Sequence, residues 1–183
     1  MNDYLAGKNI VITGAGSGIG KAIALSVARE GANIVVADYG VALDGSEPTN
    51  DIAESTAEEI RSLGVEAIPV AGDVSKMETG AQIISTAIEN WGSVDGVVCV
   101  AGILRERMLF NMSEDEWDAV IAVPLKGHFT VYRHAMAAMR KQDSGGSILG
   151  ITSGAFTAST AQPNYSAAKG GIVSLTRSAA MTA

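Results

Sequence analysis

The sequence has little cysteine and little positive charge. One of its 183 residues is cysteine, which excludes an internal disulfide framework and a cysteine-rich metal site. Lys and Arg together number 13 against 20 Asp and Glu, a formal net charge of −7. A chain this acidic has no positive surface for the phosphates of a nucleic acid or for an anionic membrane. We therefore expect no metal, nucleic-acid or membrane partner.

Long hydrophobic runs are absent too. No apolar stretch approaches the ~20 residues that cross a bilayer, and the N-terminus Met1–Leu5 has no basic segment leading into an apolar one. The sequence therefore predicts a soluble protein in a reducing compartment, the cytoplasm. At 183 residues the chain has the length of one domain, on a prior of roughly 100–200 residues per domain, and can bury a sizeable core.

Short apolar, β-branched runs alternate with stretches of helical periodicity. We predict strands at residues 8–13, 33–38, 66–70, 95–101 and 147–152, and helices at 19–29, 51–63, 76–91, 113 to about 142, and 163–183. Near-continuous apolar strands joined by helices are typical of a parallel sheet covered on both faces. The sequence therefore predicts an α/β fold with a doubly wound parallel sheet. The loop 39–50, rich in Gly, Asp, Ser and Pro, is expected to be a surface excursion.

Three glycines follow the first predicted strand and open the first predicted helix. Gly14 permits a tight turn, Gly18 lets the backbone approach a pyrophosphate, and Gly20 allows the helix to pack closely on the strand. The helix N-terminus offers free N–H groups and the positive end of its dipole to phosphates. This context predicts a dinucleotide site; the alternative is a glycine-rich turn without a ligand.

Acidic residues end the next two strands. Asp38 can accept hydrogen bonds from the adenosine ribose hydroxyls and would repel a 2′-phosphate, and neither Ser17 nor Tyr39 nearby is basic. This combination favours NAD over NADP. Asp73 and Val74 follow the third strand, at the edge where the adenine would lie. Asp73 could also serve as the N-cap of the following helix.

Tyr165 and Lys169 lie four residues apart and so share a face of the last predicted helix. An ammonium near a phenol favours the phenolate and lowers the tyrosine pKa from ~10 toward the working pH. Such a phenol can act as general acid or base on a carbinol. Ser153 lies just past the fifth strand, where its hydroxyl can hold the substrate oxygen. Thr152 is the alternative for that role.

Together these motifs resemble the classical short-chain dehydrogenase/reductase family. The resemblance extends from Lys8 to the end of the chain, and its carriers are residues 13–20, 73–74, 101–102, 153, 165 and 169. It implies a Rossmann-like fold, a single NAD-binding domain over residues 1–183, and interconversion of a secondary alcohol and a ketone. It also implies that Tyr165 is the acid/base, Lys169 the ribose anchor and Ser153 the substrate orienter. The cofactor contacts implied are Gly14, Ser17, Gly18, Ile19, Asp38, Asp73, Val74, Ala101, Gly102, Tyr165 and Lys169.

A narrower resemblance concerns the segments 101–107 and 113–118. They are similar to the dehydrogenase part of the peroxisomal multifunctional enzymes of β-oxidation. Those enzymes act on 3-hydroxyacyl thioesters, which makes such a thioester a possible substrate. The family also implies a homodimer or homotetramer. Phe129, Tyr132, Met136 and Met139 form an apolar stripe that is either core packing or a subunit interface.

Several residues depart from the family pattern. Cys99 and Val100 replace two asparagines before Ala101, and Cys99 is expected to be an inert buried thiol. Pro124 occupies the position of the catalytic asparagine, whose backbone carbonyl holds a water in the family. Proline keeps that carbonyl but lacks an N–H, so we expect a helix break there. His128 and His134 are expected to be ordinary helix residues.

The chain ends inside the helix that carries Lys169, whereas family members continue through more strands. The domain is therefore expected to be incomplete at its C-terminus, with the last strands missing. The leading hypothesis for function is an NAD-dependent dehydrogenase/reductase. The alternative is a non-catalytic dinucleotide-binding protein or a truncated, inactive family member.

Overall fold

Within the residues that the structure describes, five parallel strands form one sheet in the order β3-β2-β1-β4-β5. The structure, a computed structural model, describes residues 3–41, 49 and 51–182. The strands are β1 (Asn9–Thr13), β2 (Asn33–Asp38), β3 (Ala67–Ala71), β4 (Gly96–Cys99) and β5 (Ser147–Gly150). The central strand β1 pairs with β2 on one side and β4 on the other, so that Val11 stands between Val35 and Val97.

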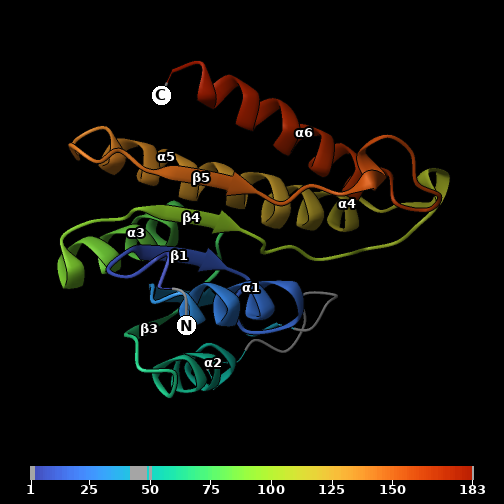
Figure 1. Ribbon diagram of the computed structural model, residues 1–183. Helices are drawn as coiled ribbons and strands as arrows, with labels where there is room; N and C mark the ends of the chain where they lie inside the picture. The colour runs from blue at the N-terminus through green and yellow to red at the C-terminus, as the bar shows by residue number, and fades with distance from the viewer. Residues whose placement is uncertain (1–2, 42–48, 50, 183) are drawn as a thin grey trace.

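In the described part of the chain, six α-helices connect or follow the strands (Figure 1). They are α1 (Gly18–Arg29), α2 (Asp51–Arg61), α3 (Met77–Trp91), α4 (Glu114–Val120), α5 (Gly127–Met139) and α6 (Pro163–Ala180). Short 3-10 turns lie at Leu109–Asn111 and Gly154–Phe156, and a π-helical segment, Ile121–Lys126, joins α4 to α5. Within the described ranges, no helix combines the length and apolarity needed to cross a membrane.

Helices cover both faces of the sheet because successive side chains of each strand point to opposite sides. Val11, Val35 and Val97 face α3 and α5, whereas Ile12 and Ile34 face α1 and α2. Fully burying one such side chain contributes roughly 1.5–3 kcal/mol. The predicted doubly wound parallel α/β fold is confirmed, and each predicted element is present with bounds shifted by a few residues. Most of the predicted excursion 39–50, namely residues 42–48 and 50, lies outside the described residues.

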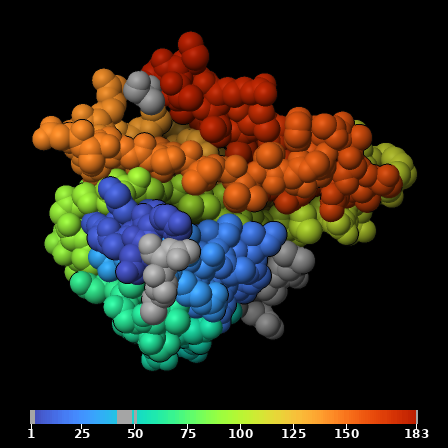
Figure 2. All heavy atoms as spheres, in the orientation of Figure 1, coloured from blue at the N-terminus to red at the C-terminus, as the bar shows by residue number. Residues whose placement is uncertain are grey.

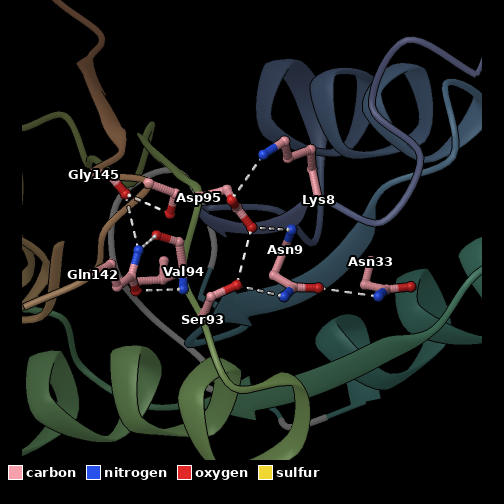
Figure 3. Close-up of polar contacts among 9 residues, drawn as sticks. Lys8, Asn9, Asn33, Ser93, Val94, Asp95, Gln142 and Gly145 are labelled. Atoms are coloured by element: carbon pink, nitrogen blue, oxygen red, sulfur yellow. Dashed lines mark hydrogen bonds and ion pairs between the residues drawn. The ribbon is translucent and has the colours of Figure 1, made fainter.

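A polar network locks the amino-terminal ends of β1, β2 and β4 together (Figure 3). The Asp95 carboxylate accepts from the Asn9 N–H at 3.0 Å and from the Ser93 hydroxyl at 3.1 Å. Asn9 in turn donates to Ser93 Oγ at 2.9 Å and accepts from Asn33 Nδ2 at 3.0 Å. Burial disfavours the charge on Asp95, but its hydrogen bonds from Asn9 and Lys8 leave the pKa of this carboxyl lowered. Side-chain hydrogen bonds therefore hold the strands together at their amino-terminal ends. The candidate site residues lie at the opposite, carboxyl ends of the strands.

The outer strand β5 lies at the surface, with the loop after it (Figure 2). Leu149 of β5 pairs with Val98, which faces α1, and is 55% exposed. It borders an apolar groove with Ile10, Val27 and Val98. This groove lies away from the carboxyl ends of the strands and contains no candidate site residue.

The apolar stripe on α5 divides between core and surface. Tyr132 and Met139 are 3% and 7% exposed and pack in the core, whereas Phe129 is 43% exposed. Core packing therefore accounts for these two side chains, whereas Phe129 and the half-buried Met136 keep surface that is accessible for a subunit contact.

Candidate active site

The carboxyl ends of all five strands meet at one edge of the sheet, because the strands are parallel. The glycine loop follows β1, and Asp38 ends β2. Asp73 follows β3, Ala101 follows β4, and Ser153 follows β5. The fold thus places at one edge the residues that the motifs singled out from distant parts of the chain.

The glycine loop is pressed against the end of β4. Gly14 has a φ of +67°, and a Cβ there would lie 2.8 Å from the backbone nitrogen of Ala101. A Cβ on Gly20 would collide with the carbonyl oxygen of Gly14. Glycine at position 14 is therefore required for the loop to pack against the end of β4. Glycine at position 20 is required for the first turn of α1 to pack against the loop.

The start of α1 is uncovered by the part of the chain that the structure describes. Gly18 has a φ of +51°, and no described residue lies within 4 Å of where its Cβ would be. Ser17 makes no side-chain cap, and the first turn contains no acidic residue. With respect to the described residues, the first-turn N–H groups and the positive end of the helix dipole are thus available to bind an anion. Ile19, 67% exposed beside them, offers apolar surface. The cradle fits the pyrophosphate of a dinucleotide.

Two backbone N–H groups hold the Asp38 carboxylate in place. Gly16 donates to Asp38 Oδ2 at 2.8 Å, and Gly40 donates to Oδ1 at 2.7 Å. A Cβ on Gly16 would lie 2.9 Å from that carboxylate, so glycine permits this close approach. Each carboxylate oxygen keeps a further lone pair, which could accept a ribose hydroxyl. The sequence pattern did not identify Gly16 or Gly40 as partners of Asp38.

Asp73 does not cap α3. Its Oδ1 accepts from the Ser75 N–H at 2.9 Å, within the turn that precedes the helix, and the N-cap is Lys76. The capping alternative is therefore wrong, because the helix begins one turn too late for Asp73 to reach its first N–H groups. Val74 is buried, and its carbonyl accepts from the Thr130 hydroxyl at 2.6 Å, which ties this turn to α5.

Thr13, the last residue of β1, hydrogen-bonds to the end of β4, where Cys99 and Val100 replace the two asparagines of the family pattern. Thr13 Oγ1 accepts from the backbone N–H groups of Val100 at 3.2 Å and Ala101 at 3.3 Å. The hydroxyl thus fixes the backbone leading to Gly102, a role that the sequence pattern did not reveal. Cys99 is a buried thiol, as expected, and burial raises its pKa to about 12.

Lys169 lies beneath Tyr165 in the site. Its side chain is 3% exposed, and its Nζ donates to the Ile151 carbonyl at 2.6 Å. The same nitrogen lies 5.3 Å from the centroid of the Tyr165 ring. Burial lowers the pKa of Lys169 to about 8. The group is therefore mostly an ammonium at neutral pH, with two further N–H donors for a ligand.

The pKa of Tyr165 shifts in the opposite direction from the one expected. Burial raises it above the ordinary value of 10.0, and a hydrogen bond with Ser153 lowers it only in part. The expectation that Lys169 lowers the pKa of Tyr165 is thus wrong for the chain without a bound cofactor. The physical reason is that the half-buried phenol has lost part of its hydration, which disfavours its ionised form.

The two candidate orienters differ in what their hydroxyls do. Thr152 Oγ1 donates to the backbone carbonyl of Lys169 at 3.0 Å and so holds α6 in place. The Ser153 hydroxyl accepts from the Ala155 N–H at 3.2 Å, and it lies close enough to Tyr165 to lower the pKa of that phenol. The geometry therefore favours Ser153 for a contact with the reacting oxygen.

The α-helix is interrupted around Pro124, close to the expected break. Residues Ile121–Lys126 form a π-helical turn that joins α4 directly to α5. The interruption is thus a local widening and not an end of the helical path; the wider turn accommodates the missing N–H and the ring. The Pro124 carbonyl lies 2.5 Å from His128 Nδ1. His128 is thus a buried partner of this carbonyl rather than an ordinary helix residue.

Comparisons with known proteins place this geometry in context. A family model described as short chain dehydrogenase matches residues 8–183. The hydroxyacyl-CoA dehydrogenase ChsB1 of Mycobacterium tuberculosis is 45% identical over 184 residues, which cover 96% of this chain and 56% of that protein. The peroxisomal multifunctional enzyme type 2 of Drosophila melanogaster is 38% identical over 175 residues, covering 96% of this chain and 29% of that protein.

A solved structure is also similar. The crystal structure of a short chain dehydrogenase from Mycobacterium avium superposes with a TM-score of 0.89 at 46% identity, covering 97% of this chain and 63% of that one. The chain thus spans 56% of the length of the mycobacterial hydroxyacyl-CoA dehydrogenase. These similarities confirm both resemblances that the motifs indicated.

Proposed function

The chain belongs to the short-chain dehydrogenase family, and from this premise we propose that it is an NAD-dependent oxidoreductase that interconverts a secondary alcohol and a ketone. The single observation that carries the proposal is the meeting of two groups of residues at one edge of the sheet. The glycine cradle lies at the start of α1. Tyr165, Lys169 and Ser153 lie at the carboxyl end of β5 and the first turns of α6.

The residues at this edge fit a nicotinamide dinucleotide. The N-terminus of α1 and the backbone around Gly18 would bind its pyrophosphate. The Asp38 carboxylate would accept the hydroxyls of the adenosine ribose, and the Lys169 ammonium would donate to the nicotinamide ribose. When bound, the nicotinamide supplies the hydride for reduction or takes it in oxidation.

Tyr165 carries the proton. Because burial raises its pKa, the phenol is neutral at pH 7 and can donate to the oxygen of a ketone as the alcohol forms. In the reverse direction the phenolate takes the proton of the alcohol, so oxidation should become faster as the pH rises. The Ser153 hydroxyl, close enough to Tyr165 to lower its pKa, holds the same substrate oxygen beside the phenol.

The substrate class proposed is a 3-hydroxyacyl or 3-oxoacyl thioester. Support comes from the name of the mycobacterial relative, a hydroxyacyl-CoA dehydrogenase. It comes also from the similarity of residues 101–107 and 113–118 to the multifunctional enzymes, one of which is 38% identical to this chain.

The experiment that tests this function is Tyr165→Phe, which removes only the phenol. We expect turnover to fall by ~10²–10⁴, while NADH binds as tightly as before. Tyr132→Phe is the matched control: it removes a buried phenol bonded to Thr176 at 3.0 Å, so it should lower stability and leave turnover unchanged. Turnover that survives in Tyr165→Phe would contradict the proposed chemistry. Tight NADH binding without turnover in the unaltered chain would favour the non-catalytic alternative.

A further inference from the structure

Asn164, the residue before Tyr165, is buried without any exposed surface and bonds to three elements at once. Its Oδ1 accepts from the backbone N–H of Tyr165 at 2.8 Å. Its Nδ2 donates to the carbonyl of Arg105 at 3.0 Å and to the carbonyl of Glu116 at 2.9 Å. One amide side chain therefore connects the start of α6 to the loop after β4 and to α4.

The bond to Tyr165 uses an N–H that the helix itself cannot satisfy. Tyr165 is the third residue of α6, and the first four N–H groups of a helix have no partner within it. The carbonyl four residues earlier, that of Ala161, instead accepts from the Arg107 N–H at 2.8 Å. The Asn164 side chain is thus the acceptor that fixes the backbone of Tyr165.

The two carbonyls that Asn164 binds belong to segments that other contacts also hold. Arg107 bonds to the Glu116 carboxylate at 2.9 Å. Glu116 closes a capping box with Ser113 at the start of α4. Arg105 follows Gly102 by three residues, on the loop that leaves the carboxyl end of β4. Asn164 therefore links the backbone of Tyr165 to the loop that borders the cofactor cradle.

We propose that Asn164 is a positioning residue: by binding the Arg105 and Glu116 carbonyls and the Tyr165 N–H, it sets where the phenol of Tyr165 stands relative to the loop after β4. The inference rests on the proposed function, in which that phenol transfers the proton. Asn164 itself acts through Tyr165 and contacts neither substrate nor cofactor. A small displacement of a reacting group costs rate rather than binding, so kcat is the quantity that should respond.

The first test needs no variant. Hydrogen exchange of the unaltered chain, followed by NMR, measures the Tyr165 amide directly. With its N–H bonded to a buried amide oxygen, it should exchange as slowly as amides in the middle of α6. Exchange as fast as that of an exposed helix end would overturn the proposal.

The second test compares two substitutions. Asn164→Asp keeps an acceptor for the Tyr165 N–H and replaces both donors with oxygen. Asn164→Leu has a similar size and removes all three hydrogen bonds. Each should lower kcat by about 10²-fold, the loss typical of a displaced reacting group, with the KM for NADH close to that of the unaltered chain.

The matched control is Asn9→Leu, at the opposite end of the sheet. Asn9 is 5% exposed, and its side chain donates to Ser93 and accepts from Asn33 (Figure 3). This substitution should lower the free energy of unfolding without lowering kcat. An equal loss of kcat in Asn9→Leu, or an unchanged kcat in both Asn164 variants, would overturn the proposal.

Measuring Tyr165→Phe in the same series distinguishes failure of the positioning role of Asn164 from failure of the proposed function. If Tyr165→Phe loses turnover and the Asn164 variants do not, only the positioning role fails. If Tyr165→Phe keeps its turnover, the proposed function itself fails.

Discussion

His128 Nδ1 lies 2.5 Å from the carbonyl oxygen of Pro124, one turn earlier in the same helical region. Because a carbonyl only accepts, the proton of the neutral imidazole is on Nδ1. Among the described residues Nε2 has no hydrogen-bond partner, although the nearby Cys99 carbonyl acts to raise the pKa of the ring. Burial and the charge of Lys169 outweigh both carbonyls and lower the pKa of His128 to about 4.

The stability of the protein should depend on the ionisation of His128. The unfolded chain binds a proton at a pKa of ~6.5, whereas the folded state binds it only near 4. Between these values the unfolded state holds more protons, so stability falls as the pH falls from about 6.5 toward 4. The full contribution is roughly 3 kcal/mol. Urea unfolding at pH 7 and pH 4.5 should show this loss.

His128→Gln, which cannot titrate, should lack that component of the loss. His134→Gln, which removes a half-buried imidazole that does not contact Pro124, should retain most of it. A stability loss in His128→Gln as large as in the unaltered chain would contradict the assignment.

Replacing Pro124 with asparagine should increase turnover. Pro124→Asn restores a backbone N–H and a side chain able to hydrogen-bond, in a turn that the ring now widens. We expect a gain of several-fold in kcat, measured with saturating cofactor. Pro69→Asn in β3 is the control, since it also removes a proline but lies in the outer strand. An unchanged kcat in Pro124→Asn would show that the carbonyl alone suffices.

Lys169 should make cofactor binding sensitive to alkaline pH. As the pH rises through about 8 the buried ammonium loses its proton, and with it the charge that attracts the cofactor. The Kd for NADH should therefore increase above pH 8, and Lys169→Ala should bind NADH weakly at every pH. Lys141→Ala, which removes an exposed lysine just past α5, should leave both the Kd and its pH dependence unchanged. An unchanged Kd in Lys169→Ala would rule out the role as ribose anchor.

Asp38 should make the chain bind NADH more tightly than NADPH. Its carboxylate is held by two backbone N–H groups and would repel a 2′-phosphate. Titrating each cofactor into the protein measures the preference, and Asp38→Asn should reduce it. Asp73→Asn, at the end of the neighbouring strand, should not. Equal affinity for the two cofactors in the unaltered chain would show that Asp38 does not select NADH over NADPH.

The sequence alone determined the elements and the residues that carry the proposed chemistry. Apolar β-branched runs such as Asn33–Asp38 form strands because their side chains suit a pleated, buried surface. Tyr165 and Lys169 share a face because a helix repeats every 3.6 residues. The glycine loop is recognisable because Gly14 and Gly20 permit backbone contacts that any Cβ would block. These are local properties, and local spacing reveals them.

Only the tertiary structure decided the environment of those residues. The carbonyls that Asn164 binds lie 59 and 48 residues away in the chain. The pKa of Tyr165 rises because the fold buries the phenol. His128 stays neutral because burial and Lys169, from another helix, disfavour its charge. Desolvation and charge act through space, so their direction depends on which distant segments the fold brings together, and no spacing along the chain contains that information.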